Sequence, residues 1–430
     1  MAISKIKEFK NGEILFAAQE ERFSRKKNDP SFPILAIKEG LKYTGFELSE
    51  IKCIAFYDKP FLKFERILEN QLNTIPFGLI PFCKNIPSWI NEKLFTQRSF
   101  KKSFKAHNLE LAKDCKFTFP EHHLSHAASA FYPSPFKSSA ILTVDGVGEF
   151  VTTGLYYGDG NSITKLKEIH YPNSLGLLYS AFTYFLGFKV NSGEYKMMGL
   201  APYGRLEEQQ TQTFIAQIKD KIITIKKDGS YALNLRYFSF TKGRKMINEK
   251  KWVRLFGIKR RTEDFTQEHA NLALAIQKVT EEAVLGLALT IKNLTNSPNL
   301  CLAGGVALNS VINGILAESP LFDEIFIQPA AGDAGGALGA ALATHHIYYE
   351  NERNVVDNYM QNGLLGNEPD QDEVALLIQG HKGDSTTYKD ENELIQDIAK
   401  YIAQDKIIGW VQGRMEFGPR ALGARSILAN

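Results

Sequence analysis

Short apolar segments that end in glycine-containing turns recur along this 430-residue chain, and they constrain its fold more than any other feature. Strand-like segments at 138–144 and 300–303 run into turns at 145–148 and 304–305, and a Gly/Ala-rich helix is expected over 332–346. Strands that alternate with helices in this way are typical of α/β domains. The sequence therefore predicts the α/β fold class.

Three turns, at 145–148, 304–305 and 332–336, have the features of one nucleotide site. Glycine lets backbone N–H groups approach a phosphate closely, and a helix that starts just after such a turn favours an anion at its N-terminus. Each turn alone is weak evidence, since an Asp-Gly turn is common and Asp333 could simply cap its helix. Together they predict a nucleotide between two halves of one domain, with 145–146 on one side and 304–305 on the other. The residues predicted to bind it are Asp145, Gly146, Gly304, Gly305, Asn309 and Gly335.

A histidine cluster predicts a metal site. The chain has nine histidines, and three of them fall within residues 122–126. His122 and His126 are four positions apart, so on a helix both rings leave the same face and can reach one ion. The alternative is a capped helix start with surface histidines. The neighbouring turns favour a metal held by His122, His126 and Asp333; without thiolates, this donor set suits iron and also permits zinc.

Residues 192–204 are expected to form a loop that carries Glu194 and Lys196. Two residues that are two positions apart in an extended loop project to the same side. They could polarise or deprotonate a nucleophile, or hold a phosphate. The alternative for such a pair is a surface ion pair.

Composition narrows the remaining choices. The net charge of +3 is too small to indicate a nucleic-acid partner, and we interpret the basic run at 242–261, in an insertion-like region, as a solvated face. No segment has the roughly 18 apolar residues of a membrane span, and 75–83 is expected to be an irregular packed loop or, less favoured, a membrane-surface contact. Four cysteines without a CxxC pair favour a reducing, cytoplasmic setting. We expect no membrane or nucleic-acid partner.

Seven motifs resemble, in their order along the chain, those of the O-carbamoyltransferase family of the nodulation and antibiotic-tailoring type. Together they are specific and extend over nearly the whole sequence. They lie at 20–27, 122–131, 145–149, 193–204, 303–309, 332–337 and 413–423.

The resemblance implies a domain organisation. Residues 1–350 would form a duplicated ribonuclease-H-like domain of the actin/hexokinase type, 351–371 a linker, and 372–430 the start of an incomplete YrdC-like domain. The first strand and loop of the family are missing, and the chain ends soon after Arg425. We therefore expect the chain as given to bind nucleotide without making carbamoyl-adenylate.

The resemblance also implies an activity: transfer of a carbamoyl group from carbamoyl phosphate, through carbamoyl-adenylate made with ATP, to a hydroxyl of a small-molecule acceptor. The co-substrates would be ATP and carbamoyl phosphate, the cofactor Fe²⁺ or another divalent metal, and a homodimer could form. A kinase of the same superfamily, or an inactive nucleotide- and metal-binding protein, are the alternatives.

The family pattern gives roles to individual residues. Asp145 would be a further metal ligand or an acceptor contact, beside the metal ligands His122, His126 and Asp333. Gly304, Gly305 and Asn309 would hold the adenosine. Lys27, Glu194 and Lys196 would be catalytic, and Lys27 and Glu194 would contact the adenylate. Carbamoyl phosphate would be bound by Arg414, Arg420 and Arg425.

Overall fold

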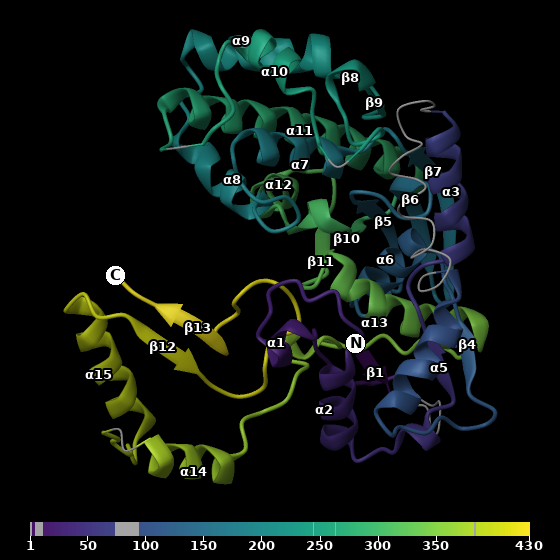
Figure 1. Cartoon of the computed structure of the whole chain (residues 1–430), viewed down its shortest axis with the longest axis vertical. Helices are drawn as coiled ribbons and strands as arrows, with labels where there is room; N and C mark the ends of the chain where they lie inside the picture. Colours follow the sequence, from purple (N-terminus) through teal and green to yellow (C-terminus); the bar gives the residue numbers. More distant parts are fainter. Residues whose placement is uncertain (1, 5–11, 74–93, 244, 263, 382–383) are drawn as a thin grey trace. The chain divides into compact units, whose positions relative to one another are not determined.

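The computed structural model describes residues 2–4, 12–73, 94–243, 245–262, 264–381 and 384–430 (Figure 1). These residues form a mixed α/β structure with two compact units. Of the described residues, those within 2–4, 13–47 and 358–430 form unit 1, and residue 12 and those within 48–357 form unit 2. Unit 2 therefore ends within the linker that the sequence predicts.

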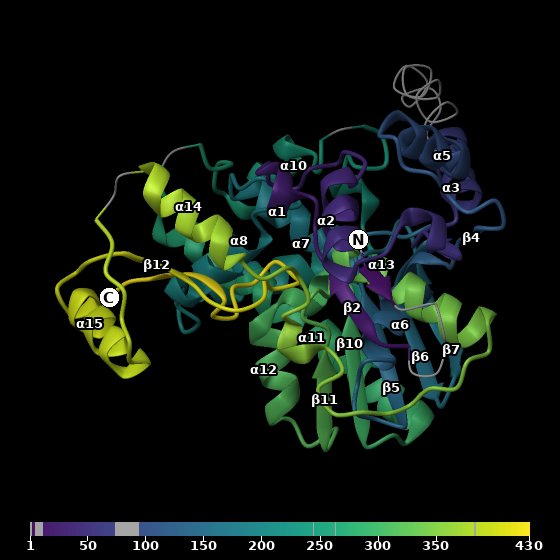
Figure 2. The ribbon, with the colours of Figure 1, turned by 90° about the horizontal axis from the view of Figure 1, so that it is seen from below.

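A five-stranded sheet forms the centre of unit 2, and Figure 2 shows its strands side by side. Strands β11, β10 and β5 are parallel, whereas β5, β6 and β7 are antiparallel neighbours. Almost every residue of β5 is buried, as expected for a central strand covered on both faces. In sheet order the strands are β11 (Glu324–Ile327), β10 (Asn299–Ala303), β5 (Ser138–Val144), β6 (Val151–Asp159) and β7 (Ser162–His170).

Strand β7 was not predicted, and its position at the edge of the sheet explains why. It is rich in lysine and glutamate and is mostly exposed, so it lacks the apolar signal of β5. Polar side chains, lysine especially, are a common means of protecting a sheet edge from association. Only pairing with β6 identifies this segment as a strand.

Two groups of helices contact the sheet of unit 2. Helix α6 packs against β5, β10 and α13, while residues of α7 and α11 join those of β5 and β10 in the main apolar core. Among the helices of unit 2, α13 confirms the Gly/Ala-rich helix predicted at 332–346, with small shifts at its ends. The helix bounds are α6 His122–Phe131, α7 Leu175–Phe185, α11 Gln267–Thr295, α12 Ser310–Glu318 and α13 Asp333–Ala343.

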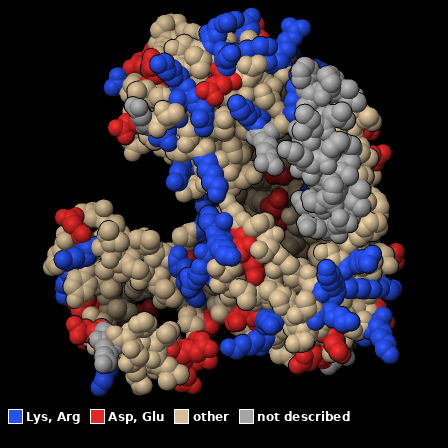
Figure 3. Space-filling view, viewed as in Figure 1, with Lys and Arg blue, Asp and Glu red and all other residues tan. Residues whose placement is uncertain are grey.

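The insertion-like region folds onto this core. Helix α10 buries Trp252 and Phe256, and leaves Lys250 and Lys251 exposed. Figure 3 shows lysine and arginine gathered over the end of unit 2 that α9 and α10 form. The region contains α9 (Gln209–Gln217), β8 (Ile223–Ile225), β9 (Tyr231–Leu233) and α10 (Glu249–Phe256).

A smaller part of unit 2 precedes the sheet. It contains the parallel strands β3 (Cys53–Ala55) and β4 (Lys116–Thr118) and the helices α3 (Pro60–Leu72) and α5 (Thr96–Ala106). The apolar segment at 75–83 lies outside the described residues. Among the helices that the structure describes, none is both long enough and apolar enough to cross a membrane.

Unit 1 combines the two ends of the chain. The buried carboxylate of Glu20 accepts hydrogen bonds from Leu35 N (3.1 Å) and Ala36 N (2.8 Å), and so caps the first turn of α2. Residues 425–428 form a strand that pairs with β12. The elements are β1 (Ala2–Ser4), β2 (Ile14–Ala17), α1 (Glu21–Ser24), α2 (Ile34–Thr44), α14 (Gln371–His381), α15 (Glu391–Ala403), β12 (Ile408–Val411) and β13 (Arg425–Leu428).

Candidate metal centre

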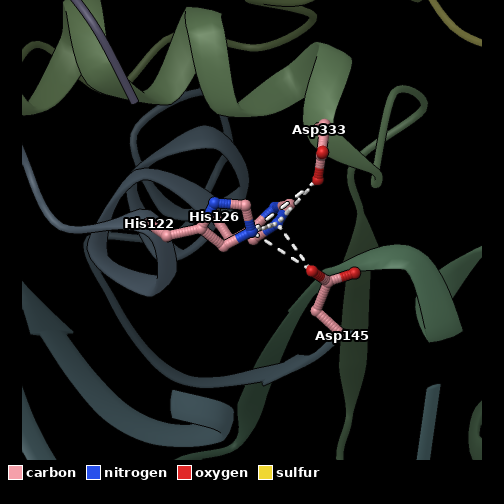
Figure 4. A group of neighbouring side chains, drawn as sticks. All are labelled: His122, His126, Asp145 and Asp333. Carbon is pink, nitrogen blue, oxygen red and sulfur yellow. Dashed lines mark hydrogen bonds and ion pairs between the residues drawn. The ribbon is translucent and has the colours of Figure 1, made fainter. Parts of the chain in front are cut away.

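Two histidines and two aspartates from three elements of unit 2 converge at one end of the sheet (Figure 4). His122 and His126 lie on one face of α6, Asp145 follows β5, and Asp333 begins α13. One ligand atom from each of the four lies within 4.8 Å of the other three. The structure thus brings together the four residues predicted as ligands, and their binding of a metal stays a prediction.

The shortest contacts centre on Nε2 of His122. This atom lies 3.1 Å from Asp145 Oδ2 and 3.1 Å from Nε2 of His126. Asp333 Oδ1 is 3.7 Å from His122 Nε2 and 3.9 Å from His126 Nε2. His123, the third histidine within residues 122–126, does not join the site and instead forms a hydrogen bond with Thr143 of β5. One residue of separation on a helix therefore decides which histidines face the site.

The cluster is closed on the helix side and open at Asp333. Both histidines are buried, whereas 61% of the Asp333 side chain is exposed. Close approach of α13 to α6 places Asp333 opposite the histidines, since a Cβ at Gly339 would lie 1.7 Å from Ser125 O. An ion in the cluster would thus be reached past Asp333.

The electrostatics of the cluster favour a positive charge within it. Burial alone would lower the pKa of His122, but hydrogen bonds to Asp145 and Asp58 raise it to about 10. Burial alone would raise the pKa of Asp145, and its bonds to His122 and His126 hold it well below the usual range. Partial burial and the charge of Asp145 raise the pKa of Asp333. The carboxylates therefore favour either a proton on His122 or a bound cation.

The donor set fits a single transition-metal ion. Ligand atoms that each lie about 2.0–2.2 Å from one ion are at most roughly 4.4 Å apart, so small side-chain shifts would suffice. Two imidazole nitrogens and two carboxylates suit Fe²⁺ and permit Zn²⁺. Nδ1 of His126 is buried and has no hydrogen-bond partner among the described residues. No contact of Nδ1 therefore competes with the orientation that places Nε2 in the cluster.

The two turns predicted to bind nucleotide meet beside this cluster. Gly305 N donates to Asp145 Oδ1 at 2.8 Å. Gly304 has φ +91°, and a Cβ there would lie 2.3 Å from Val144 O, so only glycine fits. The expectation that the turns face each other from two halves of the domain is wrong, because β5 and β10, which precede them, are neighbouring parallel strands of one sheet.

The other predicted nucleotide residues have internal partners. Asn309 is mostly buried, caps α12 by accepting from Ile312 N, and bonds to Gln277 of α11. Gly335 N donates to carbonyl groups in the turn before α13, and the carbonyl of Gly146 accepts from Ser174 Oγ. Their contact with a nucleotide stays a prediction.

Glu194 and Lys196 do not project to the same side. They lie in helix α8 (Glu194–Leu200) rather than in the expected loop, and residues two apart on a helix face different directions. The Glu194 carboxylate accepts from Ser180 Oγ (2.7 Å) and Asn191 N (2.9 Å), which fixes the start of the helix. Lys196 is exposed. The loop prediction failed because glycines on both sides suggested irregular structure.

In unit 1, two of the predicted phosphate-binding arginines hold backbone carbonyls. Arg414 donates to Leu15 O, Leu365 O and Gly366 O, as well as to Gln361 Oε1. Arg425 donates to carbonyls of its own hairpin. Lys27 is exposed, with Nζ 3.8 Å from Glu21. The role predicted for Lys27 at the adenylate stays a prediction, as do the roles of Arg414, Arg420 and Arg425 at carbamoyl phosphate.

Buried Glu416 organises the segment that carries Arg420. Its Oε1 accepts from Leu422 N (3.2 Å), Ala424 N (2.9 Å) and Arg425 N (2.8 Å). Burial alone would raise the pKa of Glu416, but the backbone N–H groups around the carboxylate lower it below 4.5. Its contribution to stability is therefore present above about pH 4.5 and is lost as pH falls through the lower pKa of the folded state.

We expect Glu416→Gln to weaken this segment by roughly 1–3 kcal/mol at neutral pH, because charge-assisted hydrogen bonds become neutral ones. Hydrogen exchange of residues 413–428, followed by mass spectrometry, measures the change. In the natural protein we expect the protection of this segment to fall as pH drops through the lowered pKa of Glu416, and the variant should lack this change. Exposed Glu368→Gln is the control, and equal exchange in both variants would contradict the assigned role of Glu416.

Comparison with known proteins identifies a family that matches this chain. The family model described as carbamoyltransferase N-terminus matches residues 3–342, and the one described as carbamoyltransferase C-terminus matches 399–430. The uncharacterized protein sll1178 of Synechocystis sp. is 47% identical over 98% of this chain and 68% of its own length. The nodulation protein NolNO of Sinorhizobium fredii is 34% identical over 98% of this chain and 57% of its own length.

Two further matches cover a smaller share of this chain. The nodulation protein NolO of Bradyrhizobium diazoefficiens is 36% identical over 72% of this chain and 53% of its own length. A crystal structure of T. kodakarensis HypF matches 60% of this chain and 39% of its own, at 16% identity and a TM-score of 0.32, a likeness too slight to support an argument. The chain thus spans little more than half the length of both nodulation proteins.

Proposed function

This chain belongs to the carbamoyltransferase family, and we propose that it performs the transfer step of a reaction in which a carbamoyl group passes from carbamoyl phosphate, through carbamoyl-adenylate made with ATP, to a hydroxyl of a small-molecule acceptor. The observation that carries the proposal is the cluster of His122, His126, Asp145 and Asp333 at the end of β5, bonded to the glycine turn that follows β10. Ligand sites of α/β proteins typically lie at the carboxyl ends of parallel strands.

The sheet supports the finer fold assignment within this proposal. Three antiparallel strands in sequence order, β5, β6 and β7, are followed by β10 and β11 on the other side of β5. This strand order supports our assignment of the sheet to one half of a duplicated ribonuclease-H-like domain of the actin/hexokinase type. The YrdC-like assignment for 372–430 rests on the resemblance of its motif at 413–423.

The four residues of the cluster would hold Fe²⁺ or another divalent metal. Such an ion supplies Lewis-acid chemistry, which polarises a carbonyl or phosphoryl oxygen. The residues themselves bind and orient: α6 presents both imidazoles, and Gly305 N fixes the carboxylate of Asp145. Because Asp333 is the exposed member, substrates would enter on its side, whereas the buried histidines exclude water from the other.

Two other functions make different predictions. A kinase of the same superfamily would release ADP and phosphorylate the acceptor. A nucleotide- and metal-binding protein without turnover would bind both ligands and form neither product. The pair of buried histidines beside two aspartates favours the carbamoyltransferase over a kinase, since kinases bind Mg²⁺ through oxygen ligands. The protein without turnover shares this cluster and is distinguished by the products of the test below.

The test follows two products. The protein is incubated with Fe²⁺, ATP, labelled carbamoyl phosphate and a panel of polyhydroxylated acceptors, and both pyrophosphate and labelled carbamate are measured. A parallel reaction receives carbamoyl-adenylate that is labelled in its carbamoyl group, so that transfer is measured separately from adenylate formation. We expect label on an acceptor in this second reaction. Label on no acceptor, or ADP with a phosphorylated acceptor, would overturn the proposal.

A further inference from the structure

A chain of hydrogen bonds enters the cluster from a residue that has no role so far. Asp58 lies between β3 and α3, and its Oδ1 is 2.9 Å from Nδ1 of His122. Its other oxygen, Oδ2, accepts from Lys63 Nζ at 2.6 Å. Asp58 and His122 are 4% and 2% exposed, so water does not compete for this bond.

The bond fixes which nitrogen of His122 faces the cluster as a ligand. A carboxylate only accepts hydrogen bonds, so Nδ1 of the ring must carry a proton toward Asp58. Without an ion, the protonated ring also donates from Nε2 to Asp145. When a cation replaces that proton, the neutral ring keeps its single N–H on Nδ1, and Nε2 presents its lone pair. That atom is the one beside Asp145 and His126, where an ion would lie.

A second carboxylate holds the backbone around this bond. Glu149 accepts from His122 N at 3.1 Å and from Lys59 N, the residue after Asp58, at 2.7 Å. It also lies at the N-terminus of α6, where a negative charge is favourable. The Glu149 side chain thus binds the backbone of His122 and the backbone next to Asp58, which limits the movement of Asp58 relative to His122.

We propose that Asp58 is a positioning residue, which holds the His122 ring with Nε2 toward the metal. The inference rests on the metal site of the proposed function. Such carboxylate–histidine–metal arrangements orient the ring and raise the basicity of the ligand nitrogen. Lys63 keeps the carboxylate of Asp58 in place by holding its second oxygen.

The test measures metal affinity by competition with a chelator, using Zn²⁺ as a diamagnetic probe. We expect Asp58→Ala to bind Zn²⁺ roughly 10–100-fold more weakly than the natural protein, as for other outer-sphere partners of metal-bound histidine. Asp58→Asn keeps an oxygen that can accept from Nδ1 and also preserves the side-chain volume. It should therefore fold normally and bind with intermediate affinity.

A spectroscopic readout separates positioning from general stability. In the Zn²⁺-loaded protein with ¹⁵N-labelled histidine, we expect His122 to show a protonated Nδ1 that exchanges slowly with water. In Asp58→Ala this proton should exchange fast. Unchanged exchange together with unchanged affinity in Asp58→Ala would overturn the inference.

Glu121→Gln is the matched control. Glu121 precedes His122, carries the same charge, and forms its ion pair with Lys59 at 3.2 Å, away from the ring nitrogens. We expect it to bind Zn²⁺ like the natural protein, and a loss equal to that of Asp58→Asn would overturn the inference, because net charge would then explain both. If His126→Ala also bound Zn²⁺ normally, the metal site itself, and not only the role of Asp58, would be wrong.

Discussion

Replacement of His126 by alanine is expected to lower the affinity for Fe²⁺ or Zn²⁺ by more than about a hundredfold, the upper range for loss of a mere outer-sphere partner. The variant removes one of two imidazole donors and leaves an acidic cluster with a single histidine. Metal content after dialysis and chelator competition measure the effect. A variant that retained one metal per chain would show that the ion is not held at this cluster.

Two further variants guard this result against misfolding. Asp333→Asn changes a side chain that is 61% exposed, so it should fold normally and still lose affinity. His170→Ala removes a histidine whose side chain is 57% exposed and paired with Glu168, and to which no role is assigned. It should bind metal like the natural protein, and a comparable loss there would point to a nonspecific effect of histidine number.

Replacement of Gly339 by alanine is expected to lower both stability and metal affinity. A Cβ at this position would lie 1.7 Å from Ser125 O, so α13 must move away from α6. Overpacking of this kind costs about 1–3 kcal/mol or more. The same movement would carry Asp333, at the start of α13, away from His122 and His126. Denaturant unfolding and Zn²⁺ competition measure the two effects.

Gly314→Ala provides the opposite case. Gly314 is an exposed helical residue of α12, and a Cβ there would contact nothing within 4 Å. Alanine should raise the free energy of unfolding by about 0.5–1 kcal/mol, since glycine is the poorer helix former. If Gly339→Ala also proved neutral or stabilising, close packing of α6 and α13 would not be what places Asp333.

Local sequence patterns predicted much of unit 2. The buried strands at 138–144 and 300–303 and the helices α6, α7, α11, α12 and α13 all have continuous apolar runs or helical periodicity. The four-residue spacing of His122 and His126 is equally local, because one helical turn places both rings on one face. These features depend on neighbours along the chain, which a sequence displays directly.

Local patterns failed where the structure depends on distant partners or on context. Strand β7 is polar and is defined by its pairing with β6, and α8 is flanked by glycines that suggested a loop. Arg414 bears a charge typical of phosphate binding, yet it holds carbonyls from residues 15, 365 and 366. A single sequence does not show which backbone groups lack partners, and those groups decide where such a side chain binds.

The sequence by itself determined the α/β class, the histidine pair and the glycine turns, because each follows from spacing within a few residues. Only the tertiary structure decided that Asp145 and Gly305 meet at neighbouring strands, and that Asp58 reaches His122 from 64 positions away. Contacts between residues so far apart depend on strand order and on how closely two helices approach. For this chain, Gly339 permits the approach of α13 to α6, and this approach adds Asp333 to the cluster of His122, His126 and Asp145.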